Sequence, residues 1–185
     1  MSSLKIEDFK VKLTGGGARP NLFKVVLDTN GYRTGSKDKL EFLCKAAQLP
    51  ASNIAPIDVP FRGRILKVAG DRTFDPWTIT VINDNDFELR HVFEKWMNDI
   101  NELTNNGGKV NPDDYFKDGS VIQLGRQSGK GPDGQVLRTY EFKGMFPTNV
   151  SAIDLSYDSS DTIEEFTVEM QVTYFTIKDG PEAIS

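Results

Sequence analysis

Alternation of apolar and polar residues is the feature that most restricts the fold of this chain. Between residues 166 and 174, apolar side chains occupy every second position, and Thr, Glu or Gln fills the positions between them. Successive side chains of a β-strand point to opposite faces, so the pattern predicts a strand with one face in a core and the other in polar surroundings. The apolar set is Phe166, Val168, Met170, Val172 and Tyr174.

The same period of two recurs along the chain and predicts about eight strands in all. Trp77, Ile79 and Val81 form another inward-facing set, and Pro76 is placed at the start of that strand because Pro cannot donate to a strand ladder. Asn30-Gly31 and Asp133-Gly134 predict hairpin connections. The other predicted strands are 22–27, 40–46, 57–65, 121–127, 140–146 and 152–157.

One segment has helical instead of strand periodicity. Its apolar residues recur every three or four positions, after capping-competent residues at 83–86, and the pattern ends near 105–108. The stripe is Leu89, Val92, Phe93, Trp96, Ile100 and Leu103. Such a stripe packs on a sheet face, so the predicted fold is an antiparallel β-sandwich or partly closed barrel with one flanking α-helix.

Composition narrows the function classes. The 185 residues with 38% hydrophobic content predict one domain, 1–185, and a net charge of −5 without a basic run argues against a nucleic-acid-binding surface. The single Cys44, expected to be a buried hydrophobe, and the single His91, expected at the surface, exclude a disulfide framework and the common zinc spacings. The N-terminal stretch is charged and no stretch approaches the ~18 apolar residues of a membrane helix, so we expect a soluble, unprocessed protein without a membrane anchor.

Four motif-like stretches resemble parts of active sites, and each has a simpler explanation. Residues 125–131 resemble a phosphate loop but lack the Ser or Thr after Lys130, so a hairpin loop is expected. Residues 84–86 begin like a calcium loop but lack its Gly and closing Glu, so helix capping is expected. The acidic pairs 113–114 and 164–165 are expected to be solvated. We therefore expect no catalytic, metal or cofactor site.

Residues 70–84, GDRTFDPWTITVIND, resemble the signature segment of the tail tube protein family of contractile-tailed bacteriophages. Three further pieces resemble that family in the same order: ARPNLF at 18–23, CKAAQLP at 44–50 and FPTNV at 146–150. The resemblance spans 18–176, and it implies one tail tube domain with an N-terminal arm at 1–17 and a variable loop at 105–119. The signature residues are Gly70, Asp71, Arg72, Phe74, Pro76 and Trp77.

We expect Gly70 to let the chain turn, Asp71 and Arg72 to fix that turn through polar contacts, and Phe74 and Trp77 to fill the core. The resemblance, which extends to the tube protein of type VI secretion, implies hexameric rings that stack into the inner tube of the tail. That tube conducts the genome on sheath contraction. The implied partners are copies of the chain itself, the tail sheath protein, the baseplate and tail terminator proteins, and the tape measure protein and genomic DNA in the lumen without specific binding. The implied location is the virion tail, assembled in the host bacterial cytoplasm.

Site residues follow from this interpretation. An acidic lumen would let DNA slide, because each phosphate neutralised by Lys or Arg adds affinity. The lumen candidates on polar faces of predicted strands are Glu41, Glu141, Asp154 and Glu169. The apolar segment 48–59 is read as a loop, and either packs on a neighbouring ring or covers its own core; its candidates are Gln48, Ala51, Ile54, Ala55 and Ile57. The sheath-contact candidates, taken as exposed helix residues, are Glu88, Arg90, Glu94 and Lys95.

Two other classes remain open from the sequence alone. A monomeric small-ligand carrier of lipocalin type would use the cavity of a barrel instead of its assembly. A hydrolase would use acidic pairs, although the carboxylates are scattered along the chain.

Overall fold

The computed structural model describes residues 6–13, 17–29, 31–32, 36–126, 135–179 and 182–184. The fold is mainly β and antiparallel, which confirms the predicted class. The described strands are β1 Phe23–Leu27, β2 Cys44–Ala47, β3 Ser52–Phe61, β4 Arg64–Phe74, β5 Trp77–Ile82, β6 Lys117–Gly125, β7 Gln135–Val150, β8 Glu165–Gln171, β9 Tyr174–Asp179 and β10 Glu182–Ile184. The described helices are α1 Ile6–Lys12, α2 Ser36–Leu43, α3 Glu88–Ile100 and α4 Pro112–Tyr115.

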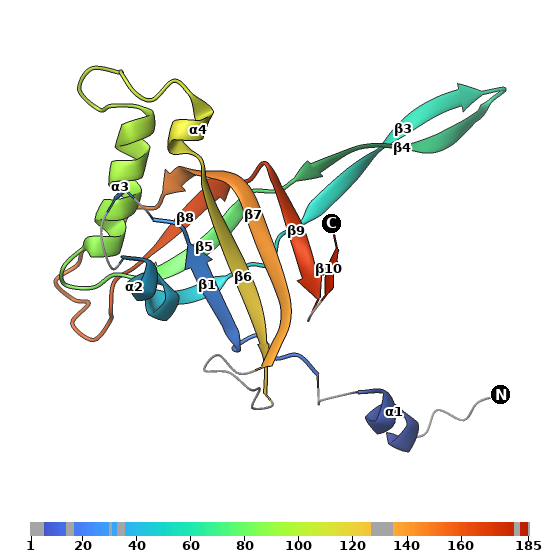
Figure 1. Ribbon diagram of the computed structural model, residues 1–185, viewed down its shortest axis with the longest axis horizontal. Coiled ribbons are helices and arrows are strands. Elements are labelled where there is room, and N and C mark those ends of the chain that lie inside the picture. The colour runs from blue at the N-terminus through green and yellow to red at the C-terminus, as the bar shows by residue number, and fades with distance from the viewer. Residues whose placement is uncertain are drawn as a thin grey trace.

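The central sheet runs in the order β1-β6-β7-β8-β5-β2, and β9 and β10 extend from β7 (Figure 1). Strand β7 is long enough to belong to both halves of this sheet: residues 138–143 pair with β9, and residues from Phe146 to Val150 pair with β8. None of the described pairings joins β1 to β2. The sheet therefore bends around a core without closing, as a partly closed barrel.

The core lies inside this bend. Trp77, Ile79 and Val81 of β5 are buried as predicted, and so are the alternating residues Phe166, Val168 and Met170 of β8. The buried face of α3 covers the core with four apolar side chains of the predicted stripe, namely Leu89, Val92, Phe93 and Trp96. Alternation and helical spacing thus identified the elements that pack against this core.

The predicted strand 166–174 is two strands. It breaks after Gln171, and Thr173 bonds across to β7: its backbone N–H donates to the carbonyl of Lys143 and its hydroxyl donates to the carbonyl of Gly144. The chain then changes its place along β7 and continues as β9. Val172 stays buried, but Tyr174 is half exposed, so its predicted position on the same inward face was wrong.

Three other local predictions were wrong. Residues 40–43 of the predicted strand 40–46 belong to α2, which buries Leu40 and leaves Phe42 exposed, so the described chain has more than one helix. Residues 152–157, all of them described, form a loop instead of a strand. Helix α3 ends at Ile100, so Leu103 is exposed.

The expected hairpin turns and the phosphate-loop-like stretch fall wholly or partly outside the described residues. Asn30 and residues 127–134 belong to the undescribed part of the chain. The described two-residue hairpin turn, Arg62-Gly63 between β3 and β4, was not predicted. Both of its residues have positive φ, 45° and 82°, which is the geometry of a type I′ turn. Arg at the first position lacks the usual Asn or Asp signal.

Candidate assembly surface

The β3–β4 hairpin extends far from the rest of the molecule (Figure 1). It pairs without interruption from Phe61 opposite Arg64 down to Pro56 opposite Ala69, where the register shifts, and it ends at Ser52 opposite Phe74. Every residue of β3 is exposed, as is nearly all of β4. A two-stranded hairpin on its own is marginally stable in water, so this one needs a partner surface.

One face of the hairpin is apolar. Directly opposed residues share a face, which places Ile57 with Val68 and Val59 with Leu66. Phe61 continues this face to the tip, where the residue is 67% exposed and stands opposite Arg64. The opposite face carries the ion pair of Asp58 and Lys67, with 3.1 Å between Oδ1 and Nζ. We call Ile57, Val59, Phe61, Leu66 and Val68 the hairpin face.

The hairpin contains most of the segment that was predicted to contact a neighbouring ring, residues 48–59. Residues 48–59 were read as a loop, but most of the segment is strand β3. The alternative in which its apolar residues cover their own core is wrong, because Ala51, Ile54, Ala55 and Ile57 are all exposed. Gln48 stands at the base of the hairpin, where its carbonyl accepts a 2.8 Å hydrogen bond from Trp77 Nε1. Ile65, predicted on the same face as Ile57, lies on the other face, opposite Pro60.

The signature residues lie at and below this base. Gly70 does not turn the chain; it lies within β4 beside the register shift, where a Cβ atom would stand 2.6 Å from the carbonyl oxygen of Ala55. Asp71 and Arg72 are exposed, and neither side chain has a polar partner among the described residues, so their predicted role in fixing a turn was wrong.

Three signature residues behave as predicted. Trp77 is buried, and its ring stacks on Phe142 with centroids 4.4 Å apart. Phe74 is partly buried against Phe175, with ring centroids 5.2 Å apart. Pro76 immediately precedes β5.

The four lumen candidates do not share one face. Glu141 lies on the polar side of β7 and forms a 2.6 Å ion pair with Lys178 of β9. Glu169 belongs to β8, which pairs with the far end of β7. Glu41 is on helix α2, paired with Lys24 at 2.8 Å, and Asp154 is in the loop after β7, so neither is on a strand as predicted.

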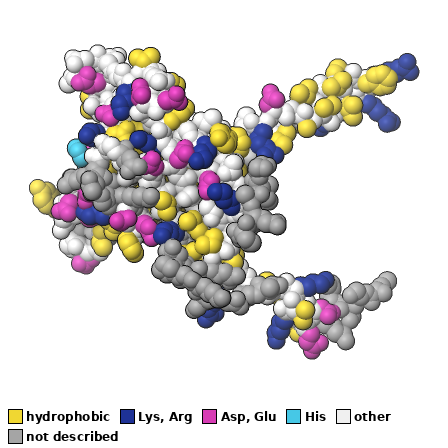
Figure 2. Space-filling model, viewed as in Figure 1, with side chains coloured by type: hydrophobic (Ala, Val, Ile, Leu, Met, Phe, Trp, Pro, Cys, Tyr) yellow, Lys and Arg dark blue, Asp and Glu magenta, His cyan; other side chains and the backbone are white. Residues whose placement is uncertain are grey.

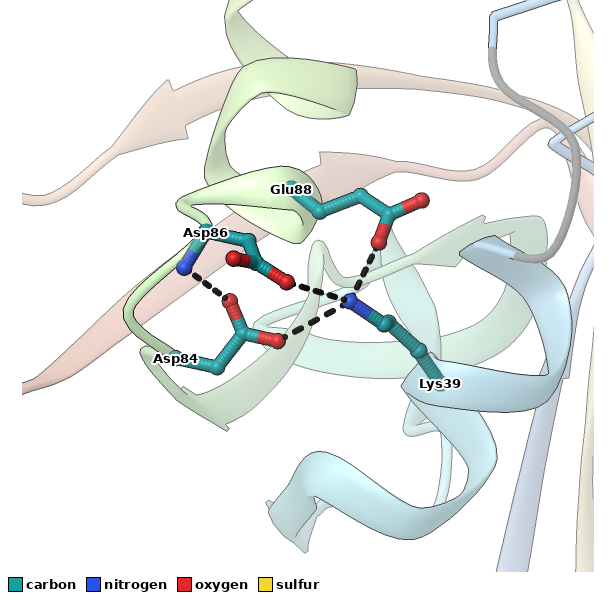
Figure 3. Close-up of polar contacts among 4 residues, drawn as sticks. All are labelled: Lys39, Asp84, Asp86 and Glu88. Carbon is teal, nitrogen blue, oxygen red and sulfur yellow. Dashed lines mark hydrogen bonds and ion pairs between the residues drawn. The ribbon is translucent and has the colours of Figure 1, made fainter.

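Among the sheath-contact candidates, Glu88 is not exposed. Its carboxylate contacts the ammonium group of Lys39, which also contacts Asp84 Oδ2 at 3.2 Å and Asp86 Oδ2 at 3.4 Å (Figure 3). Hydrogen bonds from Lys39 hold the pKa of Asp84 below its usual range, and the carboxylates raise the pKa of Lys39. The cluster attaches α2 to the start of α3.

This cluster also corrects the expected helix cap. The N-cap residue of α3 is Phe87, in the left-handed conformation and without a side-chain capping bond. The carboxylate of Asp84 instead accepts the backbone N–H of Asp86 and faces Lys39. Residues 84–86 therefore bind Lys39, and the carboxylate of Asp84 also accepts a hydrogen bond from the backbone of Glu88 at the start of α3, so the expected contact with the helix start is made from Asp84 and not from the N-cap position.

The other three sheath candidates lie further along α3. Arg90 forms a 2.8 Å ion pair with Glu94 and donates a 3.1 Å hydrogen bond to the carbonyl of Ser151, so it attaches the helix to the loop after β7. Glu94 and Lys95 are exposed. Of the four candidates, these two are the exposed ones.

Sequence reasoning missed the exposed apolar side of α1 and the charge pairing on the outer face of the sheet. Helix α1 lies apart from the sheets and exposes Ile6 and Phe9 (Figure 1). On the outer face, Lys143 pairs with Asp118 at 2.6 Å, and this pairing raises the pKa of Lys143. The i, i+3 spacing of Ile6 and Phe9 could have predicted the apolar side of a helix. Ion pairs between strands cannot be predicted without the register in which the strands pair.

The described residues contain no group of three or more side chains arranged to hold a metal ion. Within that same part of the chain, no helix has the length and apolar character required to cross a membrane. His91 is exposed and Cys44 is buried, as predicted. The interior that a ligand carrier would need to keep open contains large buried side chains, among them Trp77, Phe142 and Met170.

The sequence is similar to those of known proteins. Residues 5–178 match the profile of a family described as phage tail tube protein. The tail tube protein gp19 of Enterobacteria phage T4 is 39% identical over 166 residues, covering 88% of this chain and 93% of the phage protein.

Solved structures share the fold at low identity. A chain from the sixfold-symmetrised baseplate of the anti-feeding prophage (AFP) has a TM-score of 0.57 at 8% identity, with 86% of this chain and 92% of that chain covered. A chain from the sheath/tube terminator of an extracellular contractile injection system, PVC, has a TM-score of 0.61 at 13% identity, with 88% and 96% covered. The chain belongs to the phage tail tube protein family and is a structural component of the tail tube.

Proposed function

We propose that six copies of this chain close into a ring and that the rings stack into the inner tube through which the genome leaves the virion. The hairpin face carries this proposal, because it is an exposed apolar surface that its own molecule does not cover. The strand edges support it: among the described pairings, β1 pairs only with β6 and β2 only with β5. Copies that complete these edges remove the risk of uncontrolled pairing.

The number six is supported by the sixfold-symmetrised assembly in which a chain of the same fold occurs. The same likeness to baseplate and sheath/tube terminator structures supports the baseplate, the tail terminator protein and the tail sheath protein as partners. For the sheath contact we retain Arg90, Glu94 and Lys95 of α3, and we drop Glu88 because it is buried against Lys39.

For the lumen, we propose a surface that does not bind DNA or the tape measure protein. The net charge of −5 supports this. The pairing of Lys143 with Asp118 and of Lys178 with Glu141, on the face of the sheet that points away from the core, also supports it. Paired lysines contribute less to phosphate binding than free ones. Glu141 and Glu169, which lie on strands β7 and β8, remain the lumen candidates, whereas Glu41 and Asp154 are dropped because neither lies on a strand. The protein acts without catalysis and assembles in the host bacterial cytoplasm.

Negative-stain electron microscopy of the purified chain, combined with light scattering on a sizing column, tests the proposal. We expect hollow sixfold rings or long tubules. The double variant Ile57→Asp/Val59→Asp places two charges on the hairpin face. Compared with the wild-type chain, it should be monomeric and have an unchanged circular dichroism spectrum. A wild-type chain that stays monomeric at every concentration would refute the proposal.

A further inference from the structure

The loop and strand start that follow β7, residues 153–165, contain an open groove with a volume of about 570 Å³, and Asp158 and Asp161 belong to the same loop without lining the groove. We call this segment the groove segment. Three of its apolar side chains, Leu155, Tyr157 and Ile163, are strongly exposed, with Tyr157 fully so. Like the hairpin face, the groove segment therefore presents apolar surface that its own molecule leaves uncovered.

The groove segment is also strongly acidic. It contains five carboxylates and no lysine or arginine, and two of the carboxylates already have partners: Glu164 accepts a 2.9 Å hydrogen bond from Asn83, and Glu165 pairs with Lys45 at 2.6 Å. The remaining three, Asp154, Asp158 and Asp161, are exposed.

The hairpin has the opposite charge. Residues 52–74 contain four basic and two acidic side chains in a protein whose net charge is −5. Arg62 and Arg64 stand at the tip, beside Phe61. Figure 2 shows the apolar side chains along the projecting hairpin and basic side chains at its end. Both segments expose apolar side chains, and the charges beside these side chains are acidic on the groove segment and basic on the hairpin. The two surfaces are therefore complementary in charge.

The two surfaces lie at opposite ends of the molecule. The hairpin tip marks one end of the longest axis, and the loop after β7 lies near the other (Figure 1). A molecule cannot insert its own hairpin into its own groove at that separation. A contact between different patches on two copies is heterologous, and repetition of such a contact produces closed rings or open filaments.

We infer that the hairpin of one copy docks into the groove segment of the next copy. This inference rests on the proposed tube function and names the surface that receives the hairpin. The hairpin face packs on Leu155, Tyr157 and Ile163. Arg62 and Arg64 reach the carboxylates of Asp158 and Asp161.

Charge reversal tests the docking. The double variants Arg62→Glu/Arg64→Glu and Asp158→Arg/Asp161→Arg should each reduce the assembled fraction at least tenfold in sedimentation assays at low salt. Because all four side chains are exposed, the circular dichroism spectrum should not change. The quadruple variant, with both charges exchanged, should recover assembly. Reversal of the exposed pair Asp113 and Asp114 on α4 is the matched control and should leave assembly unchanged.

Cysteine cross-linking gives the direct test. In a Cys44→Ala background, Arg64→Cys combined with Ser159→Cys should form disulfides between copies on mild oxidation, visible as a ladder of oligomers on a denaturing gel. If the cysteine variant assembles into tubes without such cross-links and the groove variants also assemble normally, this inference is overturned and the tube function stands. A wild-type chain that forms neither rings nor tubules would overturn both.

Discussion

Trp77 stacks on Phe142 with ring centroids 4.4 Å apart, and this contact joins β5 to β7 across the core. The indole N–H of Trp77 also donates a 2.8 Å hydrogen bond to the carbonyl of Gln48, immediately before the hairpin. A second bond at the base joins Asn53 Nδ2 to Asp75 Oδ1 at 2.8 Å. Trp77 is therefore both a core residue and an anchor for the projecting hairpin.

Replacing Trp77 with Phe should keep an aromatic ring on Phe142 but remove the donor to Gln48. We expect a loss of about 1–3 kcal/mol in the free energy of unfolding, because a part-buried carbonyl loses its partner and some packing volume is lost. Urea unfolding followed by circular dichroism measures this loss. Phe74→Leu, on a partly buried ring outside the Trp77 stack, is the comparison and should cost less. An unchanged midpoint for Trp77→Phe would contradict the anchoring role.

The elements that pack against the molecule's own core could be predicted from the sequence. Trp77, Ile79 and Val81 alternate because one face of β5 is buried, and the stripe of α3 repeats because one side of the helix covers the sheet. The family resemblance rested in part on residues of this core, such as Trp77. Local pattern and tertiary packing agree at these positions.

The hairpin could not be placed in the same way. Alternation at Ile57, Val59 and Phe61 predicts a buried face, but the pattern does not state which molecule buries it. Helix α2 was missed because residues 40–46 satisfy the strand pattern, whereas contacts from distant residues favour a helix: Lys39 meets Glu88, and Glu41 meets Lys24. Such contacts depend on the fold and not on the local sequence.

Replacing Gly70 with Val should deform the hairpin without weakening the core. A Cβ atom at Gly70 would lie 2.6 Å from the Ala55 carbonyl oxygen, too close without a backbone shift. We expect at least a tenfold smaller assembled fraction, with a urea midpoint close to wild type because the hairpin lies outside the core. Gly107→Ala is the control, since its added Cβ would meet only ordinary contact, 3.6 Å from Glu102 Oε2. Normal assembly of Gly70→Val would show that the hairpin geometry is not required.

Cys44 should be nearly unreactive in the folded protein. Burial raises the pKa of its thiol from 9.0 to about 11, so the thiolate at pH 8 is scarcer by a factor of about 100. Iodoacetamide labelling followed by mass spectrometry should therefore be at least about a hundredfold slower than labelling of the same chain in concentrated urea. Equal rates in the two conditions would mean that β2 opens readily, and the placement of Cys44 in the core would then be wrong.

The Lys39 cluster should make stability depend on pH in a defined direction. The pKa of Asp84 is lowered in the folded state, so its stabilising contribution is present above the ordinary value of 3.8 and disappears as pH falls through the lowered pKa. The pKa of Lys39 is raised, so its contribution is complete below the ordinary value of 10.5 and is lost only at higher pH. Between these limits Lys39 and Asp84 are both charged, and their contribution should be constant.

Lys39→Met should therefore lower the thermal midpoint at neutral pH, because three carboxylates at the start of α3 lose their shared cation and repel one another. The difference from wild type should stay level from about pH 5 to pH 9 and shrink below the ordinary value of 3.8, as Asp84 becomes protonated. Circular dichroism melts across this range measure it. Lys109→Met removes a single ion pair with Asp99 and is the control, with a smaller effect. A difference of the same size at pH 3 and pH 7 would show that Lys39 acts by packing and not by charge.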